Sequence, residues 1–270
     1  MTRDLKKWVR SPAWIIASLI QPVIWLILFG NAFNPANMIP ASLGSSTIRN
    51  SILQTTFGGA PNYITFLTAG MLCFLMVTWA IWAGGPLVTD RSLGYLDKLL
   101  VAPISRSAIT LSLVVSSILK GLVLSVILIA LALVLPGGLV FSTGIGIVGI
   151  LGIFAVLVLL GLGFLWLFIA LAVRVTKFET LAAIGSTVGL PLLFASSALL
   201  PVSSMPAWLK NIANVNPISK TADIVRYFIV QGTSGVYPGA ILFDFAYLLV
   251  FVAVCVGIGV VVSNRGLRIQ

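Results

Sequence analysis

Six runs of mostly apolar residues, divided by polar connections, constrain this chain more than any other feature. A helix needs roughly 20 apolar residues to cross the ~30 Å hydrocarbon core of a bilayer. The runs show none of the alternating polarity that marks barrel strands of roughly 10 residues. We therefore predict six transmembrane helices, over Ala13–Phe33, Asn62–Gly84, Ser107–Leu135, Gly144–Val173, Leu181–Leu200 and Gly239–Val262.

The composition excludes a soluble protein. Of the 270 residues, 59% are hydrophobic and 8% are charged, whereas roughly 25% are charged in an average soluble domain. A soluble fold of this size cannot hide that much apolar surface from water. The predicted fold class is an all-α integral membrane protein, with residues 1–270 in a single transmembrane domain.

The basic residues are unevenly placed along the chain. The net charge of +10 arises from 16 Lys and Arg against 6 Asp and Glu, and most of the basic residues lie in the N-terminal segment, the connections after the second and fourth runs, and the C-terminal tail. Basic residues collect on the cytoplasmic flanks of membrane helices. We therefore expect a multi-pass protein of the cell membrane with both termini in the cytoplasm, and no nucleic-acid partner.

Two segments outside the runs carry helical patterns of their own. Residues 1–11 place Trp8 and its apolar neighbours on one face, which predicts a helix lying in the membrane interface. Within residues 203–236, Asn216-Pro217 is a helix-start pair, because Asn caps well and Pro suits the first helical position. The helix that follows is too short to span a bilayer, so we predict an outer re-entrant hairpin before the last span.

Motifs for catalysis and metal binding are missing. The chain contains no His, and Cys73 and Cys255 lie in separate apolar runs, so we expect no metal site. No Gly precedes a Lys, which excludes a nucleotide-binding P-loop. The acidic residues lie near the ends of the runs or in connections, whereas ion-coupled carriers keep ionisable groups near the midplane.

Residues 88–106 form the longest charged connection on the predicted cytoplasmic side. Leu93, Leu96, Leu99 and Leu100 recur there at three- and four-residue spacing among Asp, Arg and Lys residues. This pattern fits a short amphipathic helix that docks in the groove of a partner. A solvated loop lying on lipid headgroups fits the spacing equally well.

Two motifs in the chain resemble those of a known family. The first is Asp90-Arg91-x-x-Gly94-x-x-Asp97-x-Leu99-Leu100-x-x-Pro103-Ile104-Ser105-Arg106, and the second is Asn216-Pro217-Ile218-Ser219 with Asp223, Arg226 and Gly232 after it. They resemble the cytoplasmic coupling helix and the outer segment of type-2 ATP-binding-cassette (ABC) exporter permeases, which include daunorubicin-type drug and polysaccharide export permeases. The resemblance extends over essentially the whole chain.

This resemblance implies a permease subunit that is not itself an enzyme. It would pair with a second permease copy, as a homo- or heterodimer, and with separate ABC-type ATPase subunits that bind ATP and Mg²⁺. No cofactor is expected in this chain. The residues expected to couple the permease to the ATPase are Trp8, Asp90, Arg91, Gly94, Asp97, Lys98, Leu99, Leu100, Pro103 and Arg106.

The resemblance also implies a substrate path at the dimer interface, built largely from the first, second and fifth spans. The side chains expected along it are Trp25, Phe29, Phe74, Trp79, Ser186 and Pro191. Aromatic residues near span ends are also typical membrane-interface anchors. Gly185 and Gly189, at four-residue spacing, predict close helix pairing, although ordinary span composition accounts for them too. A mostly apolar path favours a lipid, a drug-like amphiphile or a lipid-linked glycan.

Two other function classes stay open on the residues alone. One is a self-contained secondary carrier or channel, against which the lack of mid-membrane acids weighs. The other is a membrane-embedded enzyme, against which the lack of a catalytic residue set weighs.

Overall fold

A computed structural model describes residues 6, 8–32, 57, 59–95, 106–141, 146–230 and 238–266. Every regular element in these ranges is helical. The longer helices are α2 (Pro12–Ala32), α4 (Tyr63–Trp82), α7 (Arg106–Val134), α8 (Gly146–Arg174), α9 (Phe178–Phe194) and α12 (Pro238–Gly266). The shorter ones are α5 (Gly85–Ser92), the 3-10 helix η3 (Val202–Ser204), α10 (Ala207–Val215) and α11 (Pro217–Val230). The predicted all-α class is confirmed.

Within the described ranges, four helical segments are long and apolar enough to cross a membrane. They are Tyr63–Ser92, Ala108–Val134, Gly146–Arg174 and Gly239–Arg265, and they correspond to the second, third, fourth and sixth predicted spans. The protein is therefore a multi-pass membrane protein. The first and fifth predicted spans contain shorter apolar helices, Ile15–Gly30 and Phe178–Phe194, and stay predictions as membrane crossings.

The fifth helix ends earlier than its hydropathy predicts. The predicted span ran to Leu200, but α9 ends at Phe194 and turns follow it. Ser196 Oγ donates to the Leu193 carbonyl oxygen at 2.6 Å and accepts from the Ala198 amide at 3.2 Å. A serine hydroxyl that bonds to nearby backbone competes with the helical ladder, and this ends the helix although the sequence stays apolar.

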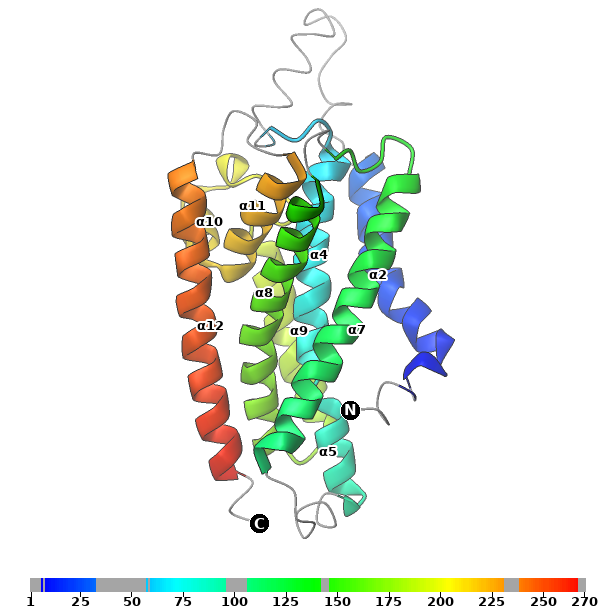
Figure 1. The fold of residues 1–270 in the computed structure, drawn as a ribbon, viewed down its shortest axis with the longest axis vertical. Coiled ribbons are helices and arrows are strands. Elements are labelled where there is room, and N and C mark those ends of the chain that lie inside the picture. Colours follow the sequence, from blue (N-terminus) through cyan, green and yellow to red (C-terminus); the bar gives the residue numbers. More distant parts are fainter. Residues whose placement is uncertain are drawn as a thin grey trace, which may run out of the picture.

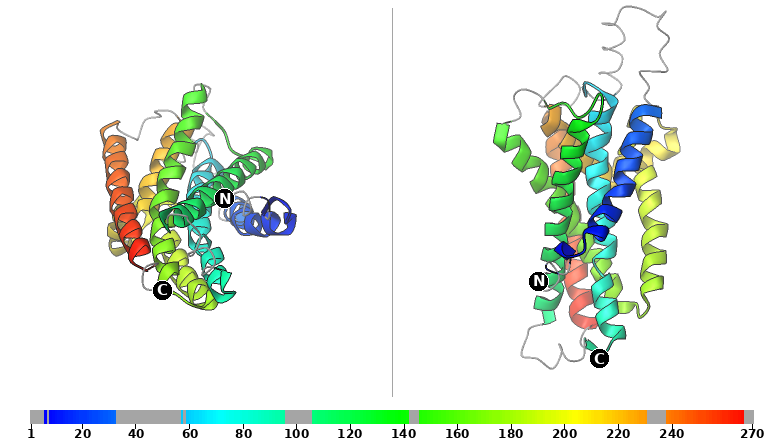
Figure 2. Two further views of the ribbon diagram at one scale, coloured as in Figure 1. Left: turned by 60° about the horizontal axis from the view of Figure 1, so that its bottom comes forward. Right: turned by 90° about the vertical axis from the view of Figure 1, so that its right-hand side faces the viewer.

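The helices form an elongated bundle in which long helices that follow one another in the chain run in opposite directions (Figure 1). Helix α4 lies near the middle, in contact with α2, α7, α8, α9 and α11, and the tilted view of Figure 2 shows it surrounded by its neighbours. It is buried along nearly its whole length. A helix that is apolar on every side suits such a central position, because it presents no polar face to a neighbour or to lipid.

The two ends of the bundle differ (Figure 1). We call one end of the bundle the α5 end. It contains α5, the start of α7, the corner between α8 and α9, and the last turns of α12. At the other, the α11 end, α10 and α11 lie beside the first turns of α12. Asn62 connects elements at the α11 end, because it caps α4 through the Thr65 amide at 2.7 Å and donates to the Gly138 carbonyl oxygen at 2.8 Å.

Candidate functional site

The coupling segment begins with helix α5, which ends before the first of the four leucines. The leucine spacing fitted a short amphipathic helix and a solvated loop equally well, and Leu96, Leu99 and Leu100 lie outside the described residues. Helix α5 ends at Ser92, and Gly94 follows with φ +66°. This left-handed conformation is the usual helix-ending position of glycine, because other residues meet a steric penalty there. Leu93 therefore lies outside α5, with 75% of its surface exposed.

Several of the predicted coupling residues lie outside the described residues: Asp97, Lys98, Leu99, Leu100 and Pro103. Asp90 lies in α5 and is half-buried, and Arg106 begins α7. The structure thus describes the start of the segment and its return into the bundle.

Arg91 points towards the body of the helix bundle. Its guanidinium donates to the backbone carbonyl oxygens of Val173 at 2.8 Å and Val175 at 3.1 Å. These carbonyls lie at the carboxyl end of α8, where a helix has no further turn to supply N–H partners. The contact between Arg91 and an ATPase stays a prediction, and this inward contact was not anticipated from the sequence.

Trp8 lies against the second predicted span. Lys6, Trp8 and Val9 are helical, and the Ser11 amide donates to the Trp8 carbonyl oxygen at 3.0 Å just before α2 begins. The Trp8 ring meets Trp79 edge to face, with centroids 6.3 Å apart. This contact ties the N-terminal segment to α4. Its predicted place in the membrane interface stays a prediction, and residues 1–5 and 7 lie outside the described ranges.

At the α11 end, Asn216 fixes where the second hairpin helix starts. Helix α11 begins at Pro217, the position that the Asn-Pro pair predicts, and Asn216 Oδ1 accepts the Ile218 amide at 2.9 Å. The Asn216 side-chain amide also donates to the carbonyl oxygens of Leu192 and Ala195 at 2.8 and 2.9 Å. One buried side chain therefore caps α11 and holds it against the end of α9.

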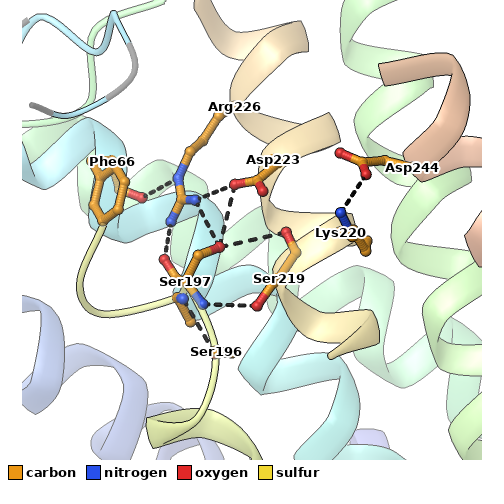
Figure 3. A network of polar contacts seen from close by, with 9 residues as sticks. Phe66, Ser196, Ser197, Ser219, Lys220, Asp223, Arg226 and Asp244 are labelled. Atoms are coloured by element: carbon orange, nitrogen blue, oxygen red, sulfur yellow. Dashed lines mark hydrogen bonds and ion pairs between the residues drawn. The ribbon is translucent and has the colours of Figure 1, made fainter. Parts of the chain in front are cut away.

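A buried arginine joins α11 to two other elements (Figure 3). Arg226 is 6% exposed, and its guanidinium donates to Asp223 Oδ1 at 2.7 Å, to the Ser197 carbonyl oxygen at 2.6 Å and to the Phe66 carbonyl oxygen at 3.3 Å. It also lies 3.7 Å from the centroid of the Phe66 ring, a cation–π distance. These contacts connect α11 with α4 and with the turn that follows α9.

The charge of Arg226 is balanced within the same network. Burial lowers the pKa of the guanidinium from its usual value, and the Asp223 carboxylate opposes that shift. Ser197 Oγ accepts from Arg226 at 3.2 Å and donates to Asp223 at 3.3 Å. A second ion pair, Lys220 Nζ to Asp244 Oδ1 at 2.8 Å, joins α11 to α12. Paired in this way, the ionic groups can hold the hairpin in one place among apolar helices.

Sequence reasoning missed this network. Lys220 and Arg226 fall within the predicted hairpin of residues 203–236, and their pairing with Asp244 and Asp223 was not anticipated. The signal was present in the helical spacing: Arg226 follows Ile218 and Ala222 at intervals of eight and four residues, which places it on the apolar face of α11. An arginine within an apolar stripe indicates a buried and paired charge.

The residues predicted for a substrate path fall into different surroundings. Trp25 stacks on Phe29 with centroids 5.1 Å apart and meets Phe194 of α9 at 5.7 Å. Ser186 and Pro191 lie on the exposed side of α9, and Trp79 is half-buried. Phe74 is 4% exposed and belongs to the core of this chain. The structure thus brings Trp25 of α2 into contact with the last residue of α9 but leaves Phe74 packed inside.

Gly185 and Gly189 allow α9 to approach α4 closely. A Cβ added at Gly185 would lie 2.1 Å from Ile81 Cγ2, and one at Gly189 would lie 2.8 Å from Ile81 Cδ1. Both glycines are buried. The close approach at this pair is therefore between two helices of the same chain. Among the described residues, no three His, Cys, Asp or Glu side chains gather where they could hold a metal ion.

Comparison with known proteins gives a consistent result. A family described as ABC-2 type transporter matches residues 1–230. The chain is 36% identical over 227 residues to the ycf38 transport permease of Porphyra purpurea. The matched region covers 83% of this chain and 69% of that protein. The chain is 25% identical over 233 residues to the daunorubicin resistance ABC transporter permease DrrB1 of Streptomyces coeruleorubidus, covering 86% and 74% of the two chains. It is also 22% identical over 236 residues to the doxorubicin resistance ABC transporter permease DrrC of Mycobacterium tuberculosis, covering 85% and 75%.

Proposed function

The chain belongs to the ABC-2 type transporter family, and we propose that it is the permease subunit of an ATP-driven exporter. The observation that carries the proposal is a bundle of membrane helices, of which the family match over residues 1–230 covers all but α12, in a sequence that lacks a nucleotide-binding motif. Such a chain is a component of membrane transport and needs a separate source of energy.

The energy source in this proposal is a pair of ABC-type ATPase subunits, with which the family normally works. ATP and Mg²⁺ would be bound by those subunits. The segment Asp90–Arg106 and the N-terminal helix around Trp8 would receive their movement. The contact of Trp8 with Trp79 supports this, because it links the N-terminal helix to the helix that leads directly into α5.

In the proposed orientation the α5 end faces the cytoplasm and both termini lie on that side. The alternating directions of the long helices support it, since α5 and the last turns of α12 share one end of the bundle and α2 runs towards the other end (Figure 1). On the outer side, α10 exposes Trp208, Ile212 and Val215 at helical spacing. This apolar stripe supports a hairpin that enters the outer leaflet.

A second permease copy completes the proposed assembly. Helix α2 exposes Ile16, Ile20 and Ile24 along one face, and the aromatic contacts of Trp25 connect this helix to α9. We place the dimer interface and the substrate path along α2 and α9. The substrate class proposed is a lipid, a drug-like amphiphile or a lipid-linked glycan, and the names of the DrrB1 and DrrC relatives support the drug-like class.

The test begins with purification of the tagged chain from native membranes. We expect an ABC-type ATPase to co-purify, and we expect Asp97→Ala or Gly94→Val to change ATP hydrolysis in the reconstituted complex. In inverted vesicles, daunorubicin uptake should need ATP and should disappear when the P-loop lysine of the partner is replaced. Purification without any ATPase would contradict the proposal. Unchanged substrate range after Trp25→Ala and Phe29→Ala, with expression checked, would remove these residues from the path.

A self-contained carrier or channel is the second candidate, and the buried ionic groups of α11 and α12 favour it. Carriers use such groups to bind coupling ions. Here, however, Arg226 and Lys220 already have acidic partners within the chain, which favours a structural role. If the purified chain alone moved daunorubicin along a proton or sodium gradient, the carrier would replace the ATP-driven exporter.

A further inference from the structure

Arg91 lies in the segment expected to contact an ATPase, but its guanidinium is engaged elsewhere. The two hydrogen bonds to Val173 and Val175 use its Nη2 and Nη1 groups. Both acceptors are backbone carbonyls at the end of α8, and a cation is favoured there because the helix dipole leaves partial negative charge at the carboxyl end. The planar fork of arginine can serve two acceptors at once, which a lysine cannot reproduce.

The helix that carries Arg91 is packed tightly on the same corner. Leu87 and Val88 of α5 are buried in a small apolar cluster with Ala172, Val173 and Leu181. This cluster contains residues from α5, α8 and α9. Arg91 therefore adds two hydrogen bonds at the edge of an apolar contact between α5 and α8.

Two glycines show how little space separates these elements. A Cβ at Gly84 would lie 2.4 Å from Ala172 Cβ, and one at Gly85 would lie 3.0 Å from the Phe178 ring. The ring of Trp82, two residues before Gly84, stacks on Phe178 with centroids 5.9 Å apart. Closely packed surfaces respond to a force by moving together, because they have no empty volume into which they can deform.

Helix α8 connects this corner with the rest of the bundle. It contacts α4, α11 and α12 along its length, and a Cβ at Gly152 would lie 2.7 Å from the Phe228 ring of α11. A displacement of α5 can thus reach the outer hairpin through α8. At its other side α5 ends at the Gly94 turn, so Arg91 is the last charged residue of the helix before the chain leaves it.

We propose that Arg91 is a positioning residue, which clamps α5 to the carboxyl end of α8 so that movement of the coupling segment is passed to α8 and the outer hairpin. In this arrangement Arg91 does not itself contact the ATPase. The inference rests on the proposed function for the source of the movement. The clamp itself is a property of the single chain.

The experiment compares Arg91→Ala, Arg91→Lys and the matched control Arg174→Ala, which removes an exposed arginine from the same end of α8. Hydrogen exchange of the purified chain in nanodiscs reports the clamp. In Arg91→Ala the Val175 amide, which donates to the Leu171 carbonyl oxygen, should exchange roughly tenfold faster, which corresponds to about 1.4 kcal/mol of lost local protection. Arg91→Lys should recover part of the lost protection of the Val175 amide, and in Arg174→Ala this amide should exchange at the wild-type rate.

The same variants are then studied in the complex with the co-purifying ATPase, using Mg-ATP and vanadate as the probe. We expect Arg91→Ala to retain the ATPase within about twofold of the wild type. The nucleotide-dependent change in exchange over residues 207–230 should nevertheless be lost in this variant. Arg174→Ala should keep both the ATPase and the change.

Each other outcome overturns the inference in a recognisable way. If Arg91→Ala releases the ATPase while exchange at Val175 stays normal, Arg91 is an ATPase contact. If Arg91→Ala binds and responds as the wild type does, Arg91 transmits nothing, although the exporter function stands. If the wild type binds no ATPase, the proposed function fails and the coupling role of Arg91 fails with it.

Discussion

The buried arginine of α11 offers the sharpest test of how α11 is held in the bundle. Arg226→Ala removes the hydrogen bonds to Asp223, Ser197 and Phe66 together with the ring contact on Phe66. It leaves the Ser197 and Phe66 carbonyls without the cation that now faces them. It also leaves Asp223 without its counter-charge.

The magnitude follows from these contacts. Hydrogen bonds to a charged group contribute roughly 1.5–3 kcal/mol each, and breaking a fully buried ion pair costs roughly 3–5 kcal/mol in total. The Asp223 side chain is 37% exposed, so water can partly replace its partner, and this share must be discounted. We expect a net loss of about 3 kcal/mol, which would lower the melting temperature by roughly 6–10 °C.

The assay is thermal unfolding of the chain in nanodiscs. Arg226→Lys keeps the charge but not the planar, forked guanidinium, so its loss of stability should be about half of that of Arg226→Ala. Asp223→Asn should cost less than Arg226→Ala, because its Oδ1 can still accept. Lys210→Ala, which removes an exposed basic residue from the same hairpin, should melt with the wild type. If Arg226→Ala melted within about 2 °C of the wild type, or if Asp223→Asn cost more, the network would not be what holds α11.

Single contacts elsewhere in the chain can be tested in the same way. Gly185→Ala should destabilise the chain by roughly 1–3 kcal/mol, because its Cβ would meet Ile81. Adding Ile81→Ala should recover part of this loss. A double variant whose loss of stability equals the sum of the two single losses would contradict this packing. Gly94→Ala should cost about 1–2 kcal/mol of helix-end stability from backbone strain alone, because a Cβ added there would meet nothing within 4 Å. Exchange of the Leu93 and Gly94 amides, which donate to the carbonyl oxygens of Thr89 and Arg91, should rise accordingly. Asn216→Ala should cost roughly 1–2 kcal/mol, since it loses the cap of α11 and the two hydrogen bonds to the end of α9. Asn216→Asp should keep the cap and lose only the two donated hydrogen bonds. Equal melting temperatures of the wild type and both variants would refute this role of Asn216.

The class of the protein and most of its helices could be predicted from local sequence. Apolar run length determines whether a segment can cross a bilayer, and four predicted spans have helices of the expected length and position. The Asn216-Pro217 pair marks the start of α11, because capping depends on residues next to each other in the chain. The motifs of the coupling segment and the outer segment indicated the family, which the family match over residues 1–230 confirms.

The tertiary structure decided which of these helices meet and which polar groups they enclose. Hydropathy does not separate a lipid-facing side from a core-facing one, because lipid tails and neighbouring helices are equally apolar. The burial of α4 and the pairing of Arg226 with residues from α4 and the turn after α9 both depend on contacts between distant segments. The inward turn of Arg91 is of the same kind, since its acceptors lie more than 80 residues away in the chain. The sequence of a segment determines which surroundings, apolar or polar, it can occupy. Only the packing of the whole chain decides which residues provide those surroundings.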